Sequence, residues 1–113
     1  MGAIKLDINQ IKTLYSTYRV LYQRKVMLGG KEKEGTINFS KRLFKISTRN
    51  SLLDQLETIV HEYYHSVFNE LEIDSPEESE INLLSRALVK FIRENQELIK
   101  FIIEYKGEDN AKV

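Results

Sequence analysis

The chain has 113 residues, equal numbers of basic and acidic side chains, and no cysteine. This length suits one domain with a modest core, and the absence of cysteine excludes disulfides, thiolate metal sites and cysteine nucleophiles. Hydrophobic residues make up 42% of the chain, too many for a disordered protein. No apolar run is long enough for a membrane span or a signal peptide. We therefore expect a single cytoplasmic domain over 1–113.

Charge is unevenly distributed along the chain. Residues 1–50 carry eleven Lys or Arg against three Asp or Glu, whereas residues 51–113 carry six against fourteen. A basic half can indicate a nucleic-acid surface, but these basic residues never form a run of five. We expect the two halves to attract each other within one fold, and we do not expect nucleic acid or a membrane as a partner.

The first 50 residues have the pattern of β-structure. Tyr18, Val20 and Tyr22 alternate with more polar positions, which predicts a strand over residues 18–23. Part of the segment between Ile4 and Leu14 is expected to be a strand, and residues 29–35 a charged connection. Residues 36–39 and 42–47 predict a hairpin with a turn near Ser40 and Lys41. We expect an α+β fold with a small antiparallel sheet of about three strands.

The period changes to that of an amphipathic helix after residue 50. The spacing predicts a helix over 51–71, with Ser51 as its N-cap. Its expected core stripe comprises Leu53, Leu56, Val60, Tyr63, Val67 and Leu71.

A second helix is expected to follow directly, before a shorter third one. We expect Ser75 to cap the second helix, with Pro76 at its first position and Glu78 as a capping-box acid. Its expected apolar side comprises Ile81, Leu84, Leu88, Phe91 and Ile92. Asn95 should end or kink it, and a third helix should run over 96–105, so that residues 51–106 are helical and 107–113 a polar tail.

One motif carries chemistry: residues 61–65 read His-Glu-Tyr-Tyr-His, an HExxH. On a helix, residues four apart point the same way, so His61 and His65 can bind one metal ion. Glu62 can then act as a general base toward a zinc-activated water. The two histidines lie away from the expected core stripe, which favours a metal site over a pair of structural histidines.

A zinc site of this kind needs a third protein ligand. Because the chain has only two histidines and no cysteine, that ligand must be Asp or Glu. Glu77, Glu78 and Glu80 are the candidates just downstream. On the helical wheel, Glu77 and Glu80 lie closer to the apolar side of the second helix than Glu78 does.

With these motifs, residues 35–100 resemble a small zincin-type metallopeptidase of the kind found in phages and mobile elements, and more distantly the ImmA/IrrE-like peptidases. The resemblance implies a minimal zincin-like fold, with the sheet packed on the HExxH helix and a following helix pair. It also implies that Glu78 of an ExxxN pattern is the third ligand, ahead of Glu80 and Glu77, and that Asn82 orients a liganding histidine. The strand ending near Ile46 is expected to be the substrate-side edge of the sheet.

The sequence therefore predicts a zinc-dependent metallopeptidase that hydrolyses a protein or peptide substrate, with Zn²⁺ on His61, His65 and Glu78. The alternative is a zincin-derived module that binds a host or regulatory protein without catalysis. Tyr15, Tyr22, Arg86 and Tyr105 are possible oxyanion-stabilising groups, and no motif distinguishes among them.

Overall fold

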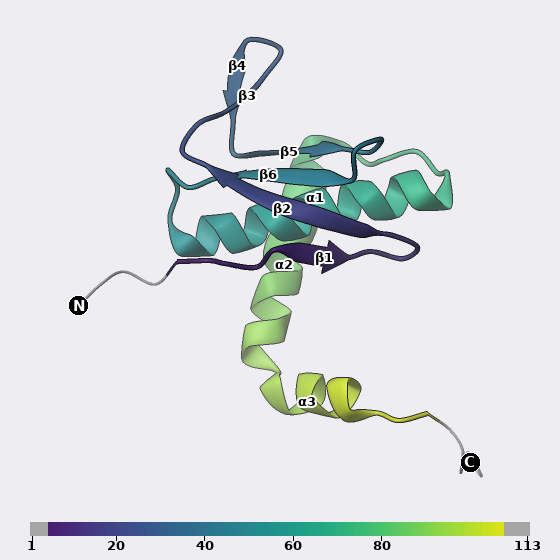
Figure 1. The fold of residues 1–113 in the computed structure, drawn as a ribbon. Helices are drawn as coiled ribbons and strands as arrows, with labels where there is room; N and C mark the ends of the chain where they lie inside the picture. Colours follow the sequence, from purple (N-terminus) through teal and green to yellow (C-terminus); the bar gives the residue numbers. More distant parts are fainter. Residues whose placement is uncertain (1–4, 108–113) are drawn as a thin grey trace.

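The computed structural model describes residues 5–107, in which six strands precede three helices (Figure 1). The predicted α+β class and the change from strands to helices near residue 51 are confirmed. Ile4 and positions 108–113 of the expected polar tail lie outside the described residues. The elements are β1 (Gln10–Lys12), β2 (Thr17–Gln23), β3 (Val26–Leu28), β4 (Lys31–Lys33), β5 (Gly35–Asn38), β6 (Leu43–Ser47), α1 (Leu52–Leu71), α2 (Glu78–Glu94) and α3 (Gln96–Glu104).

The main sheet has four strands in the order β1-β2-β6-β5. The predicted β5–β6 hairpin is confirmed, and β1 also pairs antiparallel with β2. The prediction of an antiparallel sheet of about three strands was wrong, because β2 and β6 run parallel with Val20 opposite Phe44. Parallel neighbours need a long connection, and residues 24–42 supply it by carrying a second hairpin and β5 before the chain enters β6.

That second hairpin occupies the stretch expected to be a charged connection. Strands β3 and β4 pair antiparallel, with Val26 opposite Lys33. Gly29 and Gly30 form the turn at φ of +59° and +79°, a left-handed conformation that glycine adopts without steric cost. The hairpin projects from the main sheet (Figure 1). Because charged side chains dominate β4, the alternation that usually marks a strand is missing there.

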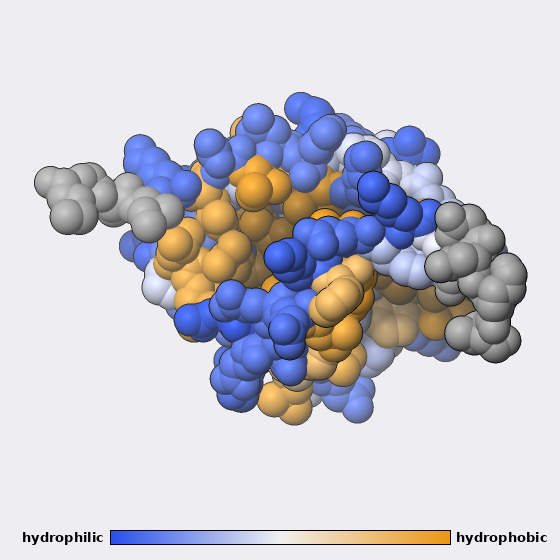
Figure 2. Space-filling model, turned by 90° about the horizontal axis from the view of Figure 1, so that it is seen from below, coloured by the Kyte–Doolittle hydropathy of each residue, from blue (hydrophilic) through white to orange (hydrophobic). Residues whose placement is uncertain are grey.

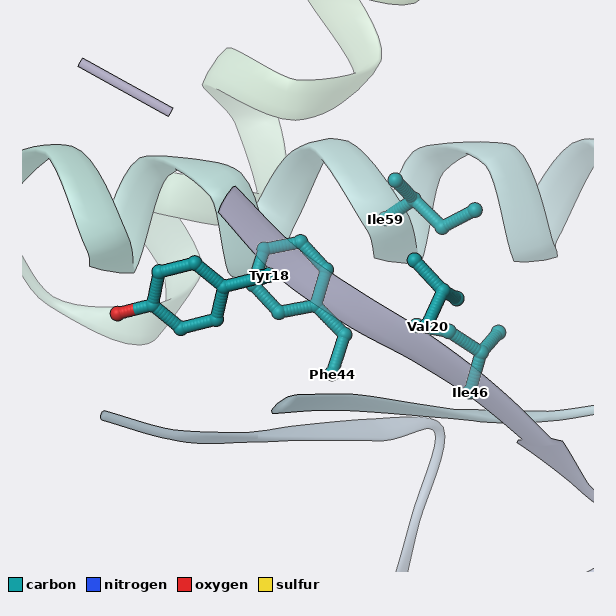
Figure 3. Packing of buried hydrophobic residues seen from close by; sticks show 5 residues of the cluster. All are labelled: Tyr18, Val20, Phe44, Ile46 and Ile59. Atoms are coloured by element: carbon teal, nitrogen blue, oxygen red, sulfur yellow. The ribbon is translucent and has the colours of Figure 1, made fainter. Parts of the chain in front are cut away.

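The core lies between the sheet and α1. Tyr18 and Val20 point inward from β2, Phe44 and Ile46 from β6, and Ile59 from α1 (Figure 3). The predicted alternation along β2 is confirmed, since Tyr18 and Val20 are buried between exposed neighbours. The Tyr18 and Phe44 rings pack with centroids 5.0 Å apart. This cluster fixes the side of α1 that faces the sheet.

The helix predicted over 51–71 is confirmed, but its expected core stripe is only partly right: Tyr63 packs against the core cluster, whereas the ends of the stripe do not. The Ser51 hydroxyl accepts a hydrogen bond from the Asp54 amide at 3.1 Å, as an N-cap should. Leu53 and Leu71, at the two ends of the expected stripe, are 40% and 44% exposed. The helix instead buries Thr58, Ile59, Glu62 and Ser66.

Local hydrogen bonding explains why polar residues can occupy this buried face. The Thr58 hydroxyl donates to the Asp54 carbonyl at 2.7 Å, and the Ser66 hydroxyl donates to the Tyr63 carbonyl at 2.6 Å. Each hydroxyl is therefore satisfied within its own helix, so its burial costs little. A helical wheel that counts only apolar residues does not detect such a face.

A tight turn after α1 brings α2 back across it (Figure 1). Glu72 adopts a left-handed conformation at φ 56°, and its N–H donates to the Asn69 carbonyl at 3.1 Å. The Ile73 N–H donates to the Phe68 carbonyl at 3.1 Å. These bonds close the C-terminus of α1 in the manner of a Schellman motif.

The start of α2 differs from the prediction. Glu77 is the N-cap and forms a capping box with Glu80, so Ser75 is not the cap and Glu78 is not the capping acid. The Glu77 amide donates to Glu80 Oε1 at 3.1 Å. Because Glu77 and Glu80 satisfy each other's backbone groups, the carboxylate of Glu78 is left to face elsewhere. The helix begins at Glu78, two residues later than the predicted start at Pro76.

The predicted break at Asn95 between α2 and α3 is confirmed. The expected apolar side of α2 is wrong: Ile81 is buried, but Leu84, Phe91 and Ile92 are about two-fifths exposed. The helix packs through Ile81, Ser85 and Val89 instead. Within residues 5–107, every helix is too short or too polar to span a membrane.

Candidate metal centre

The two histidines of the HExxH lie one turn apart on α1, with both Nε2 atoms directed at the same point. The Nε2 atoms are 3.2 Å apart. The rings meet edge to face with centroids 4.9 Å apart. The i, i+4 spacing on a continuous helix is sufficient to produce this arrangement.

Glu78, the first residue of α2, places its carboxylate over both imidazoles. Glu78 Oε1 lies 3.1 Å from His61 Nε2, and Oε2 lies 2.8 Å from His65 Nε2. Its side chain is 69% exposed, whereas those of the histidines are mostly covered. The carboxylate therefore closes the group from the solvent side.

His61, His65 and Glu78 offer donor atoms that could hold a metal ion. Zinc binds imidazole nitrogen and carboxylate oxygen at about 2.0–2.1 Å, so neighbouring ligand atoms should be about 3.3 Å apart. The two Nε2 atoms, 3.2 Å apart, are close to this value, whereas the 3.1 and 2.8 Å contacts join His61 to Oε1 and His65 to Oε2 of Glu78. Hydrogen bonding alone accounts for them less well: if both imidazoles donated to Glu78, two N–H groups would face each other. A cation between the three groups satisfies all of them.

Burial favours the metal-binding form of His65. Desolvation lowers the pKa of His65, while the nearby Glu78 carboxylate opposes the shift. The neutral imidazole keeps the lone pair that a metal requires. Ser75 Oγ lies 3.4 Å from the other ring nitrogen, Nδ1. Such a partner fixes which nitrogen faces the metal.

Glu62 lies beside the group but points between α1 and β5. Its side chain is 5% exposed. Burial, followed by the charge of Glu78, raises the pKa of Glu62 to about 8. Within residues 5–107, no hydrogen bond or ion pair engages the Glu62 carboxyl. A largely buried carboxyl that borders the pocket beside the His61, His65 and Glu78 cluster is well placed to exchange a proton.

Gly35 allows β5 to approach this part of α1. A Cβ at position 35 would lie 2.5 Å from Thr58 Cγ2, 3.1 Å from the Lys45 carbonyl oxygen and 3.4 Å from Glu62 Oε2. Only glycine leaves room for so close a contact between strand and helix. The glycine therefore positions the strand edge directly beside the buried carboxyl.

A pocket of about 270 Å³ opens between β5, α1 and α2. The carboxylates of Glu62 and Glu78 line this pocket, together with His61. Arg86 contributes a positive charge, and its Nε lies 3.8 Å from Glu57 Oε1. The other lining residues are Lys33, Glu34, Gly35, Asp54, Glu57, Thr58, Asn82 and Ser85.

The structure separates the three candidate third ligands. Glu78 joins the histidines, with one ligand atom of each residue lying within 4.8 Å of the others. Glu77 and Glu80 are instead engaged in the capping box. Asn82 lines the pocket, but among residues 5–107 it makes no hydrogen bond to either imidazole. Ser75 occupies the supporting position that was expected for Asn82.

Three further features of the site escaped sequence reasoning. The strand β6, expected to be the substrate-side edge, lies between β2 and β5, so β5 is the edge strand and it borders the pocket. Ser75 was assigned to a helix cap, and only the three-dimensional path of the turn places it beside His65. Gly35 fell at the end of the predicted charged connection, and its close approach to Thr58 depends on how strand and helix pack.

Comparison with family models, curated proteins and solved structures finds no match to this chain.

Proposed function

We propose that the chain is a zinc-dependent metallopeptidase that hydrolyses a peptide bond of a protein or peptide substrate. The observation that carries the proposal is the meeting of His61, His65 and Glu78, with ligand atoms within 4.8 Å of one another, beside the buried Glu62. Two histidines and a glutamate are a ligand set of catalytic zinc sites that keep an open position. Zinc in such a site activates water near neutral pH and polarises a carbonyl.

Glu62 is proposed as the general base. Its carboxyl borders the pocket but takes no part in the group formed by His61, His65 and Glu78. It can therefore accept the proton of the attacking water and later deliver it to the leaving amine. Its desolvated position strengthens such proton exchange, because no protein donor competes for the carboxyl oxygens.

Arg86 is proposed to stabilise the negative charge that develops on the carbonyl oxygen. Of the four residues considered for this role, Arg86 lines the pocket, whereas Tyr22 donates its hydroxyl to the Ile8 carbonyl at 2.9 Å. Tyr15 lines a different pocket. The Glu57 carboxylate lies 3.8 Å from the guanidinium and draws it toward α1, so a positive charge is available beside the pocket.

The edge strand β5 is proposed to bind the substrate backbone. An edge strand carries unpaired backbone N–H and C=O groups, to which an extended peptide can add as a further strand. Because Gly35 lies in both β5 and the pocket wall, a peptide added there would pass beside Glu62.

The decisive experiment combines metal content and peptide cleavage. We expect the purified chain to contain one zinc per molecule by elemental analysis and to cleave peptides from a mixed library. Glu62→Gln keeps the size of the side chain but removes the base, so it should retain zinc and lose turnover by about 10²–10⁴-fold. The matched control is Asp54→Asn, which removes another carboxylate from the same helix and pocket.

Two outcomes would count against the proposal. If the parent chain holds no zinc, and if His61→Ala and His65→Ala leave its metal content unchanged, the metal centre is excluded. Zinc retained in parent and Glu62→Gln without any turnover in either would instead favour the binding module. In that case the zinc would hold α1 and α2 together for recognition of a partner protein.

A further inference from the structure

The end of α2 and the whole of α3 form an arm that stands apart from the rest of the molecule (Figure 1). The radius of gyration is 15.9 Å, against about 13 Å for a compact chain of this length. None of the nine residues of α3 is buried. The arm is defined as residues 90–104, which follow the buried Val89 and include no buried residue. It therefore lacks the packing that normally holds a short helix in place.

The arm is strongly apolar despite its exposure. In α3, Phe101, Ile102 and Ile103 are 70%, 60% and 75% exposed. Leu98 is also exposed, and Phe91 and Ile92 continue the apolar surface onto α2. Viewed from the α3 end, hydrophobic side chains gather on this face of the molecule (Figure 2). A helix that is apolar on most sides is normally covered by other protein.

The exposed apolar area is large enough for a stable interface. These six side chains leave on the order of 600 Å² of apolar surface in water, at the upper end of what a monomer exposes. A standard protein interface buries about 800 Å² per partner, including its polar rim. The arm could supply such an area by itself.

The arm has a basic part, at the end of α2, and an acidic part, in α3. Residues 90–94 of α2 carry Lys90 and Arg93 against one acidic residue, Glu94, which pairs with Lys90 within the helix. Residues 96–104 of α3 carry Glu97 and Glu104 against one basic residue, Lys100. Two arms placed antiparallel about a two-fold axis bring the basic α2 segment of each copy beside the acidic α3 of the other. Because of the two-fold symmetry, the same basic–acidic contact then occurs twice in the interface.

We propose that the chain forms a two-fold symmetric dimer in which the arms of two copies pack antiparallel as four helices. The aliphatic and aromatic side chains of α3 form its centre, and the α2–α3 charge pairs form its rim. The proposal does not depend on the metal centre, because the arm lies beyond the α1–α2 crossing.

The first test is the mass of the chain in solution by analytical ultracentrifugation over a concentration series. We expect a dimer at micromolar concentration. Phe101→Asp should raise the dimer dissociation constant by about 30-fold or more, as for a central interface residue. Leu28→Asp is the matched control: it removes a comparably exposed leucine from the β3–β4 hairpin and should leave the dissociation constant unchanged.

The second test exploits the charge pattern and does not alter the apolar residues. One variant combines Lys90→Glu with Arg93→Glu, and the other combines Glu97→Lys with Glu104→Lys. Each should associate more weakly alone, whereas an equimolar mixture should recover the dimer mass as a heterodimer. A monomer at every concentration, a dimer that persists in Phe101→Asp, or a mixture that stays monomeric would overturn the proposal. Far-UV circular dichroism verifies that each variant keeps its helices.

Discussion

The two halves of α2 differ in how they use their side chains. The first half packs on α1 through Ile81 and Ser85 and delivers Glu78 to the histidines. The second half and α3 carry larger apolar residues, such as Phe91 and Phe101, yet leave them exposed. The comparison shows that hydrophobicity alone does not decide which face of a helix is buried. Satisfied hydroxyls such as that of Ser85, which donates to the Ile81 carbonyl at 2.7 Å, can displace large apolar side chains from a contact.

The largest expected effect is the difference in unfolding free energy between a core substitution and a substitution in the arm. Phe44→Ala should lower the free energy of unfolding by about 3–5 kcal/mol, because Phe44 is fully buried between β6 and α1. Phe101→Ala should change it by less than about 0.5 kcal/mol when the chain is monomeric. Urea denaturation at low protein concentration measures both. Equal losses in the two variants would show that the arm is part of the folded core.

The second prediction concerns the contribution of Glu78 to metal affinity. Glu78→Gln should weaken zinc binding by about 100-fold or more, because a neutral amide is a poor zinc ligand. Glu80→Gln is the control, since Glu80 lies two residues away but takes part in the capping box. Competition with a chelator of known affinity gives both constants. The assignment fails if Glu80→Gln has the larger effect.

The third prediction tests the close approach of β5 to α1. Gly35→Ala should destabilise the fold by about 1–3 kcal/mol, because the added Cβ meets Thr58 Cγ2 and the Lys45 carbonyl. Thr58→Ser removes the methyl group while keeping a hydroxyl that can bond to Asp54. The double variant should therefore recover part of the loss in a double-mutant cycle. Strict additivity of the two single effects would contradict this account.

The smallest effect is expected at Ser75. Ser75→Ala removes the 3.4 Å contact with His65 Nδ1, and we expect zinc affinity to fall by about tenfold, the low end for a supporting residue. Ser79→Ala is a suitable control on the first turn of α2. Indistinguishable affinities in the two variants would remove Ser75 from the site.

The parts of this molecule that the sequence predicts are those set by local geometry. The HExxH spacing places two imidazoles on one face of a helix, and the alternation around Val20 marks a strand with one buried side. The identity of the acidic third member of the cluster depends on which glutamates close the capping box. Spacing alone does not decide among Glu77, Glu78 and Glu80. The role of these residues as metal ligands stays a prediction until zinc is measured.

The parts that could not be predicted depend on packing between distant segments. The parallel β2–β6 pair joins residues such as Arg19 and Leu43, whose partnership no short pattern encodes. The buried face of α1 was missed because Thr58 and Ser66 satisfy their own hydroxyls and so behave as small core residues. The β3–β4 hairpin was missed because its second strand, with Glu32 between two lysines, lacks an apolar side.

The parallel pairing of β2 with β6 has a consequence for the order of folding. The β5–β6 hairpin and the α1–α2 crossing join segments close in sequence, so they can form within microseconds. The β2–β6 ladder must first close the intervening chain between Arg19 and Leu43, which delays it relative to these local contacts. We therefore expect the helical signal to appear before the Tyr18–Phe44 contact during refolding. Assembly of the HExxH helix pair would then precede completion of the sheet on which it rests.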